Sequence, residues 1–207
     1  MTTFNPPLKQ GEHVVVIGPT GSGKTVLARA FLSSLPYVVV LDSKDELSWK
    51  GWKRAKTLEP IRWIDASRCI LRAPIGGTRA MADGLFRTVY EQRGWTVYID
   101  EVYSLGFTHT QVPSSYPLLL TRGRSRGITV WTGTQRPRFL PLFAFTESKH
   151  FFVFAVQSID DLLVIKRQTS PEVAELVSGL KKHEFVYYNK ETGQAIKSAP
   201  LSLKKGG

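Results

Sequence analysis

Short apolar runs alternate along the chain with segments in which apolar residues recur every three or four positions. Runs rich in β-branched residues are typical of buried strands, and the periodic segments are typical of amphipathic helices. This alternation predicts an α/β fold with a mostly parallel sheet. Strands are expected at residues 13–17, 37–41, 61–64, 69–72, 96–99, 128–132 and 150–156, and helices at residues 78–92, 116–121, 159–167 and 171–180, after an earlier helix that ends near residue 34.

The end of the chain departs from this alternation. Residues 185–188 and 195–197 flank the turn Lys190-Glu191-Thr192-Gly193, and two strands around such a turn predict a closing β-hairpin. No repeat, low-complexity segment or linker interrupts the sequence. One domain is therefore expected over residues 1–207, with a short extension at 1–12 and a frayed basic tail at about 201–207.

A glycine-rich motif follows the first expected strand directly. Gly18-Pro19-Thr20-Gly21-Ser22-Gly23-Lys24-Thr25 matches the G-x-x-x-x-G-K-[ST] phosphate-binding loop, and a helical pattern follows it. Glycines let backbone N–H groups surround phosphates, and the helix N-terminus adds positive potential. Lys24 is expected to reach the β- and γ-phosphates, and the Thr25 hydroxyl to ligate Mg²⁺. The motif predicts binding of ATP with Mg²⁺.

Two carboxylates end the strand expected at residues 96–99. In phosphate-loop NTPases an acidic residue at such a strand end holds Mg²⁺, often through water, and Asp100 fits that role. The adjacent Glu101 is expected to act as general base on the attacking water. The chain turns at the end of the strand, so both side chains are able to reach one site. The alternative is a solvated strand end without chemistry.

Three arginines precede the strand expected at residues 128–132, and an amide follows that strand. Arg122, Arg124 and Arg126 form a dense positive segment, for which we consider an arginine finger in a neighbouring subunit's site, a contact with DNA phosphate, or a solvated basic turn. Gln135 is expected to sense the γ-phosphate or to orient water. Its alternative role is a loop amide bonded to local backbone.

The charge balance points to a polyanionic partner. Lysine and arginine number 28 against 17 acidic residues, which gives a formal charge of +11. Nucleic acid is the simplest such partner, whereas a basic surface kept for solubility and an anionic membrane surface are alternatives. Cys69 is the single cysteine, which excludes an internal disulfide, and it is expected to be a small buried apolar residue. No signal peptide or integral membrane segment is recognised, so an intracellular protein is expected.

Taken together, these elements resemble the FtsK–HerA superfamily of DNA-pumping ATPases. The resemblance spans residue 14 to about residue 156, and its most specific part is a glycine–arginine element, one strand, and then T-Q-R-P. Gly133 stands where alanine is more usual before Thr-Gln, and this change is expected to leave the role of Gln135 intact. The matching pieces are the phosphate-binding loop, Ile99-Asp100-Glu101, Gly123-Arg124-Ser125-Arg126-Gly127-Ile128 and Thr134-Gln135-Arg136-Pro137.

The resemblance implies a P-loop NTPase fold of the RecA/FtsK type and a specific kind of motor. Because little precedes the first strand, the chain is most similar to the compact genome-packaging ATPases of tailless icosahedral viruses with an internal membrane. That implies an ATP-driven translocase of double-stranded DNA, acting as a pentameric or hexameric homo-oligomeric ring on a preformed capsid. Capsid or membrane vertex proteins would be its partners, and the host cytoplasm and the packaging vertex its locations. Arg124 matches the family's arginine finger best, with Arg122 and Arg126 left open.

Contacts with DNA are expected at two places. One is a basic segment that also carries Trp49 and Trp52, and the other is the loop at residues 106–111. Backbone phosphate contacts should dominate, because a motor must grip any sequence. The two tryptophans are expected to pack beneath a loop rather than to stack on bases. The basic residues of the first segment are Lys44, Lys50, Lys53, Arg54 and Lys56.

Three other function classes remain open from the sequence. A filamentous-phage-type assembly ATPase shares the core motifs but usually carries a membrane segment. A small-molecule or nucleoside kinase has a phosphate-binding loop and an arginine-rich lid, and would be active as a monomer. A nucleotide-gated DNA-binding or capsid protein without catalysis is disfavoured by the intact set of Lys24, Thr25, Asp100 and Glu101.

Overall fold

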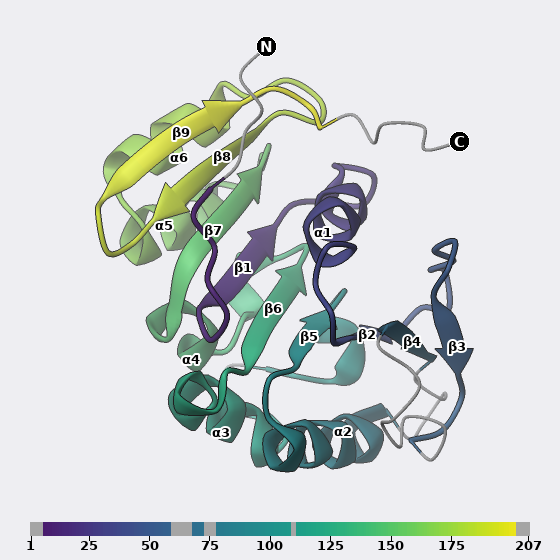
Figure 1. Ribbon diagram of the computed structural model, residues 1–207. Helices are drawn as coiled ribbons and strands as arrows, with labels where there is room; N and C mark the ends of the chain where they lie inside the picture. Colours follow the sequence, from purple (N-terminus) through teal and green to yellow (C-terminus); the bar gives the residue numbers. More distant parts are fainter. Residues whose placement is uncertain (1–5, 59–67, 73–77, 109–110, 202–207) are drawn as a thin grey trace.

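A 9-stranded sheet forms the centre of the computed structural model, which describes residues 6–58, 68–72, 78–108 and 111–201 (Figure 1). The strand order is β3-β4-β2-β5-β6-β1-β7-β8-β9, parallel from β3 to β7 and antiparallel at β7–β8 and β8–β9. The predicted mostly parallel sheet with a closing hairpin is therefore confirmed. The strands are β1 His13–Ile17, β2 Val38–Asp42, β3 Lys53–Ala55, β4 Arg68–Arg72, β5 Thr96–Ile99, β6 Thr129–Thr134, β7 Ser148–Phe154, β8 Phe185–Asn189 and β9 Gln194–Ser198.

Helices cover both faces of this sheet, so the inner strands β1, β2, β5 and β6 are buried along their whole length. Along β1, Val14 and Val16 pack with α1, whereas Val15 and Ile17 belong to the cluster that includes residues of α2 to α6. Burial on both faces explains why β1 and β2 are nearly continuous apolar runs rather than alternating ones. The helices are α1 Lys24–Leu32, α2 Thr78–Gln92, α3 Ser115–Arg122, α4 Leu142–Thr146, α5 Ile159–Gln168 and α6 Pro171–Ser178, with short 3-10 turns at Tyr103–Leu105, Arg124–Arg126 and Pro137–Phe139.

Most expected elements are found with shifts of one or two residues at their ends. The strand expected at residues 61–64 lies outside the described residues, as do residues 109–110 of the candidate DNA loop and residues 202–207 of the basic tail. Two elements were not predicted: β3, which is a short polar edge strand, and α4. Trp49 packs edge-to-face on Trp52 and lies over Tyr98, so the expected packing of the tryptophans beneath a loop is confirmed. Cys69 is buried, as expected.

Because the inner strands are parallel, all their carboxyl ends lie at one edge of the sheet and all their amino ends at the other. Residues that follow β1, β5 and β6 lie together at the carboxyl edge, and residues that precede these strands lie at the amino edge (Figure 1). In this strand order β6 lies between β1 and β5, so the three strand ends that carry the predicted motifs are neighbours. In the described part of the chain, no helix is long and apolar enough to span a bilayer.

Candidate functional site

The phosphate-binding loop, residues 18–25, connects the carboxyl end of β1 to the first turn of α1. The loop is fixed at its start because the Gly18 N–H donates to the Thr134 carbonyl at the end of β6, at 3.0 Å. Gly21 and Gly23 have φ angles of 74° and 113°, which side-chain-bearing residues rarely adopt. Ser22 Oγ is buried and has no hydrogen-bond partner among the described residues. The loop thus offers an unpartnered hydroxyl in addition to its backbone N–H groups.

The Lys24 side chain is folded onto its own loop. Its Nζ donates to the Gly18 carbonyl at 2.6 Å and to the Pro19 carbonyl at 3.1 Å. Burial lowers the pKa of Lys24, and the nearby carboxylates of Glu101 and Asp100 act in the opposite direction. The ammonium group therefore lies between the loop and the two acidic residues, where phosphate charge is expected.

Thr25 and Asp100 meet across the carboxyl edge. The Thr25 hydroxyl donates to Asp100 Oδ1 at 3.2 Å, and the Tyr98 hydroxyl donates to the same oxygen at 2.7 Å. Tyr98 is fully buried, and burial together with the Asp100 charge raises its pKa well above the usual value, so it stays a donor. The buried phenol thereby fixes the orientation of the Asp100 carboxylate toward the loop.

This oxygen pair fits Mg²⁺. Magnesium is usually bound by one or two protein oxygens together with substrate phosphates and water, and it does not need a dedicated protein cage. In the described part of the chain no group of three or more His, Cys, Asp or Glu side chains is placed to hold a metal. A hydroxyl and a carboxylate beside a phosphate-binding loop are the donor set that Mg²⁺ with a nucleotide requires.

Glu101 is held between the ends of β5 and β6. One carboxylate oxygen accepts the Gln135 N–H at 2.9 Å, and the other accepts the Tyr103 N–H at 3.3 Å. The side chain is only 4% exposed. Burial raises the pKa of Glu101, although these hydrogen bonds and the charge of Lys24 oppose the shift. The structure therefore brings Glu101 and Gln135 together, with a carboxylate whose proton affinity is higher than usual.

Gly133 is required by the close approach of β5 and β6 at this site. A Cβ added there would lie 2.3 Å from the Asp100 carbonyl oxygen and 2.8 Å from the Ile99 carbonyl oxygen. These are backbone atoms, so they cannot move aside cheaply. Glycine stands here in place of the more usual alanine because the backbone at Ile99 and Asp100 leaves no room for a Cβ.

Pockets flank the phosphate-binding loop on both sides. One cavity of about 360 Å³ is mostly apolar, and another of about 380 Å³ extends from the loop to Gln135 and Asp161. His183 lines both cavities, and its Nδ1 donates to the Ser22 carbonyl at 3.0 Å. Phe154 and Phe185 line the first cavity, which we call the apolar cavity, and do not line the second. The residues of the apolar cavity beyond the loop are Val26, Leu27, Phe154, His183, Phe185, Pro200 and Leu201.

The predicted arginines do not join this site. We call residues 122–127 the arginine turn; it connects α3 to β6 and lies at the amino edge, at the opposite end of β6 from Gln135. Arg122 and Arg124 are exposed. Arg126 instead donates to the Tyr90 carbonyl at 3.2 Å and lies over the Tyr90 ring, 4.1 Å from its centroid. Arg126 is thus held by contacts within its own chain, whereas Arg122 and Arg124 are exposed to solvent.

Sequence reasoning missed several residues of the carboxyl edge. Tyr98 was detectable, because residues two apart on a strand share a face and Tyr98 therefore lies beside Asp100. Lys44 was considered only for DNA, but its charge acts on both Lys24 and Glu101. It follows Asp42 at the end of β2, so strand order alone would have placed it near the site. His183 had no sequence signal, because a chain separation of 161 residues divides it from Ser22.

Comparisons with known proteins agree with this geometry. The chain is 24% identical over 204 residues to the DNA packaging ATPase P9 of Enterobacteria phage PRD1, covering 92% of this chain and 87% of that protein. The solved structure of the genome packaging NTPase B204 from Sulfolobus turreted icosahedral virus 2 with AMPPCP superimposes with a TM-score of 0.80 at 21% identity, covering 94% of this chain and 100% of that one. No protein-family model matches the chain.

A more distant likeness has the same core. The pCW3 conjugation coupling protein TcpA, solved with ATPγS, has a TM-score of 0.64 at 14% identity, covering 91% of this chain and 59% of that one. The structural likenesses establish the fold, which is that of a P-loop NTPase. With the match to P9, they support the expected resemblance to compact viral packaging ATPases of the FtsK–HerA type.

Proposed function

We propose that the protein is an ATP-hydrolysing motor that packages viral double-stranded DNA into a capsid. The observation that carries this proposal is the convergence of three strand ends, where Thr25 bonds to Asp100 and Glu101 bonds to the backbone of Gln135. Similarity over nearly the whole chain to the packaging ATPase of phage PRD1 supports the coupling of hydrolysis to DNA packaging.

The cis part of the site binds ATP and holds the metal. The backbone N–H groups of residues 20–25 surround the phosphates, and Lys24 moves from its loop carbonyls to the β- and γ-phosphates. Thr25 and Asp100 would hold Mg²⁺, and Tyr98 orients the Asp100 carboxylate for this role. Mg²⁺, when bound, would offset the negative charge that the phosphates carry. The aromatic wall of the apolar cavity accommodates the nucleobase.

Hydrolysis requires a base for the attacking water, and Glu101 supplies it. The carboxylate takes one proton from the water as the water oxygen bonds to the γ-phosphorus and the bond to the β,γ-bridging oxygen breaks. Its raised pKa favours this step, because a stronger base accepts the proton more readily. Glu101 accepts a hydrogen bond from the Gln135 N–H, so a shift of Glu101 when the γ-phosphate leaves would move the end of β6. The Gln135 side chain is the group that senses this loss of phosphate.

The arginine finger comes from a neighbouring subunit. The arginine turn lies at the amino edge, away from the phosphate-binding loop of its own chain, so a second copy must present it. Arg124 is the finger we favour, because Arg126 is bonded to Tyr90 in its own subunit. Arg122 is the alternative, since it is also exposed. The ATP sites are therefore completed between subunits of a homo-oligomeric ring.

DNA and the packaging vertex are the partners of this ring. A charge of +11 suits a track of phosphates, and backbone contacts would make binding weaken steeply with salt. Among the basic residues considered for this contact, Arg54 is already paired with Asp45, whereas Lys50 is exposed. The motor acts in the host cytoplasm and at the vertex, with capsid or membrane proteins as its docking partners.

Steady-state ATP hydrolysis tests the proposal. Turnover is measured with and without linear double-stranded DNA across a range of protein concentrations and at increasing salt. A ring motor gives turnover that rises with DNA, rises steeply with protein concentration and loses its DNA response at high salt. Turnover that is indifferent to DNA and concentration would contradict the proposal and would indicate a self-contained NTPase or kinase.

A further inference from the structure

The segment that leads into β1, including its first residue His13, is hydrogen-bonded to the arginine turn at Gly127 and to residues on either side of the turn. We call residues 9–13 the N-terminal clamp. The Gln10 side-chain amide donates to the Gly127 carbonyl at 2.6 Å and to the Gly94 carbonyl at 3.2 Å, and the Gly11 N–H donates to Thr129 Oγ1 at 2.8 Å. Gly127 and Thr129, the two ends of the short connection between the arginine turn and β6, are thus held by residues that lie 117 and 118 positions earlier in the chain.

Gly11 touches the backbone of Arg124 directly. Its φ angle is 90°, and a Cβ added to it would lie 3.0 Å from the Arg124 carbonyl oxygen. The clamp and the arginine turn are therefore packed backbone against backbone. A side chain at position 11 would have to displace Arg124 or distort the clamp.

His13 fixes the other end of the arginine turn. Its Nδ1 accepts the Val130 N–H at 3.0 Å, and its Nε2 donates to the Leu120 carbonyl at 2.9 Å. Because Nδ1 is an acceptor, the single ring proton is on Nε2, and the neutral ring satisfies both partners. The ring joins the last turn of α3 to β6, on either side of Arg122 and Arg124.

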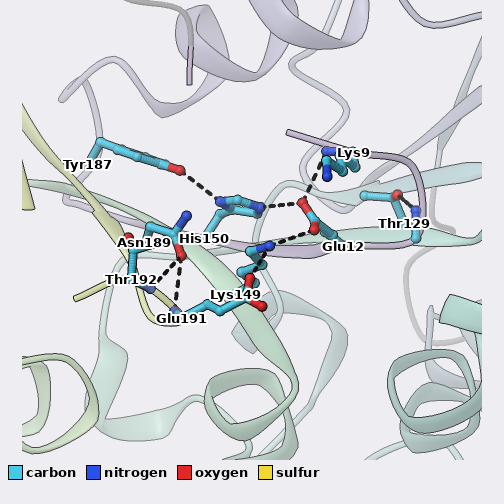
Figure 2. Close-up of polar contacts among 10 residues, drawn as sticks. Lys9, Glu12, Thr129, Lys149, His150, Tyr187, Asn189, Glu191 and Thr192 are labelled. Carbon is cyan, nitrogen blue, oxygen red and sulfur yellow. Dashed lines mark hydrogen bonds and ion pairs between the residues drawn. The ribbon is translucent and has the colours of Figure 1, made fainter. Parts of the chain in front are cut away.

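Glu12 anchors the clamp to β7. Figure 2 shows its carboxylate receiving the Lys9 N–H, the Lys149 ammonium at 2.7 Å and His150 Nε2 at 2.8 Å. His150 in turn accepts the Tyr187 hydroxyl at 2.9 Å, which extends the network to β8. Burial raises the pKa of Glu12, but the Lys149 and His150 hydrogen bonds lower it more, to about 2. Glu12 is therefore ionised at neutral pH. The contacts named here come from β7, through Lys149 and His150, and from Lys9 of the clamp itself.

We propose that the N-terminal clamp is a positioning element that holds the arginine turn in the geometry needed by the neighbouring subunit's ATP site. The inference rests on the proposed function, because the finger is taken to act between subunits. Gln10, Gly11 and His13 act through Arg124 and touch no substrate. A guanidinium stabilises transition-state charge only when the backbone that carries it is correctly positioned. A displacement of the guanidinium by about 1 Å is able to lower the rate about 100-fold.

Mixing of two inactive variants separates this role from a general loss of stability. A donor chain carries Lys24→Ala, which removes its own ATP site but leaves its arginine turn, and an acceptor chain carries Arg124→Ala. Mixed at concentrations at which rings form, the pair regains hydrolysis, because donor arginines complete acceptor sites. Gly11→Ala is then placed either in the donor or in the acceptor. We expect it to lower the regained rate about 10- to 100-fold in the donor and to leave it nearly unchanged in the acceptor.

Gln10→Ala in the donor is a second and milder variant, because Gln10 is exposed and the substitution leaves no buried cavity. Gln194→Ala, an exposed glutamine on β9, is the matched control and should not change the regained rate. Equal losses from Gly11→Ala in donor and acceptor, or no loss from either clamp variant in the donor, would overturn the positioning role. If the plain donor and acceptor regain nothing, the shared-site arrangement itself fails, and the clamp proposal falls with it.

Discussion

Acid should destabilise the fold through His13 before it protonates any ordinary carboxylate. Burial lowers the pKa of His13 from 6.5 to about 4, with the Leu120 carbonyl opposing the shift and the charge of Arg124 adding to it. Both ring nitrogens are already committed, and a second ring proton would face the Val130 N–H. The folded state therefore resists protonation, whereas the unfolded chain binds the proton near pH 6.5.

The sign and size of the effect follow from this difference. Between pH 6.5 and pH 4 the unfolded state binds more protons than the folded state, so stability is full above that window and is lost as the pH falls through it. The difference between 6.5 and about 4 corresponds to a loss of about 3 kcal/mol from His13. His150, whose pKa is also lowered by burial, adds a loss of the same sign, and Glu12 adds its own only below pH 4.5, where it is protonated in the unfolded chain.

Urea unfolding followed by tryptophan fluorescence measures this loss at a series of pH values from 7 to 4.5. The comparison protein is His13→Asn, which keeps an acceptor near the Val130 N–H but does not titrate. Because His150 and Glu12 are present in both proteins, the difference between the two pH profiles isolates His13. We expect the wild-type free energy of unfolding to fall by about 2 to 3 kcal/mol more than that of the variant. Parallel profiles would refute the assignment of a neutral, doubly bonded imidazole at this position.

Four further results are expected from substitutions at the two edges of the sheet. Glu101→Gln should bind ATP with near wild-type affinity in an equilibrium nucleotide-binding assay but lose at least about 100-fold in single-turnover hydrolysis. Arg124→Ala should lose about 10³-fold or more in steady-state turnover with nucleotide affinity retained, and normal turnover would exclude it as the finger. Gly133→Ala should lower stability by about 1 to 3 kcal/mol in thermal unfolding, because its Cβ meets the Asp100 carbonyl at 2.3 Å. His183→Ala should weaken nucleotide binding about 3- to 10-fold through loss of its bond to the Ser22 carbonyl, and unchanged affinity would remove it from the site.

Strand ends were the part of the site that the sequence could predict. An apolar run followed by glycines, or by Asp100-Glu101, indicates a strand and the polar residues at its carboxyl end. Parallel strands end at the same edge of the sheet, so these polar residues lie at a common edge. The meeting of Thr25 with Asp100 follows from that rule once β1 and β5 are known to be separated by β6 alone. The rule says nothing about the amino edge, where a motif marks the arginine turn but none marks the N-terminal clamp that holds it.

Contacts of the N-terminal clamp could not be predicted for a physical reason. They join residues separated by 107 and 138 positions, from His13 to Leu120 and from Glu12 to His150. These partners depend on β1 lying between β6 and β7, and neither hydrophobic periodicity nor local propensity reports which strands are neighbours. The edge strand β3 escaped prediction for the opposite reason, because Lys53 and Arg54 are exposed and carry no apolar signal.

The two edges give a structural reason for the proposal that the arginine finger acts on a neighbouring subunit rather than on its own. β6 has the arginine turn before it and Gln135 after it, and its six residues span roughly 20 Å. β1 repeats the arrangement, with the clamp before it and the phosphate-binding loop after it. A guanidinium at the amino edge is therefore held apart from its own loop by two fully buried strands, and in the proposed ring a second copy brings the two edges together. If the proposed arrangement holds, a substitution in the phosphate-binding loop lowers hydrolysis in the subunit that carries it, whereas a substitution in the clamp lowers hydrolysis in the neighbouring subunit.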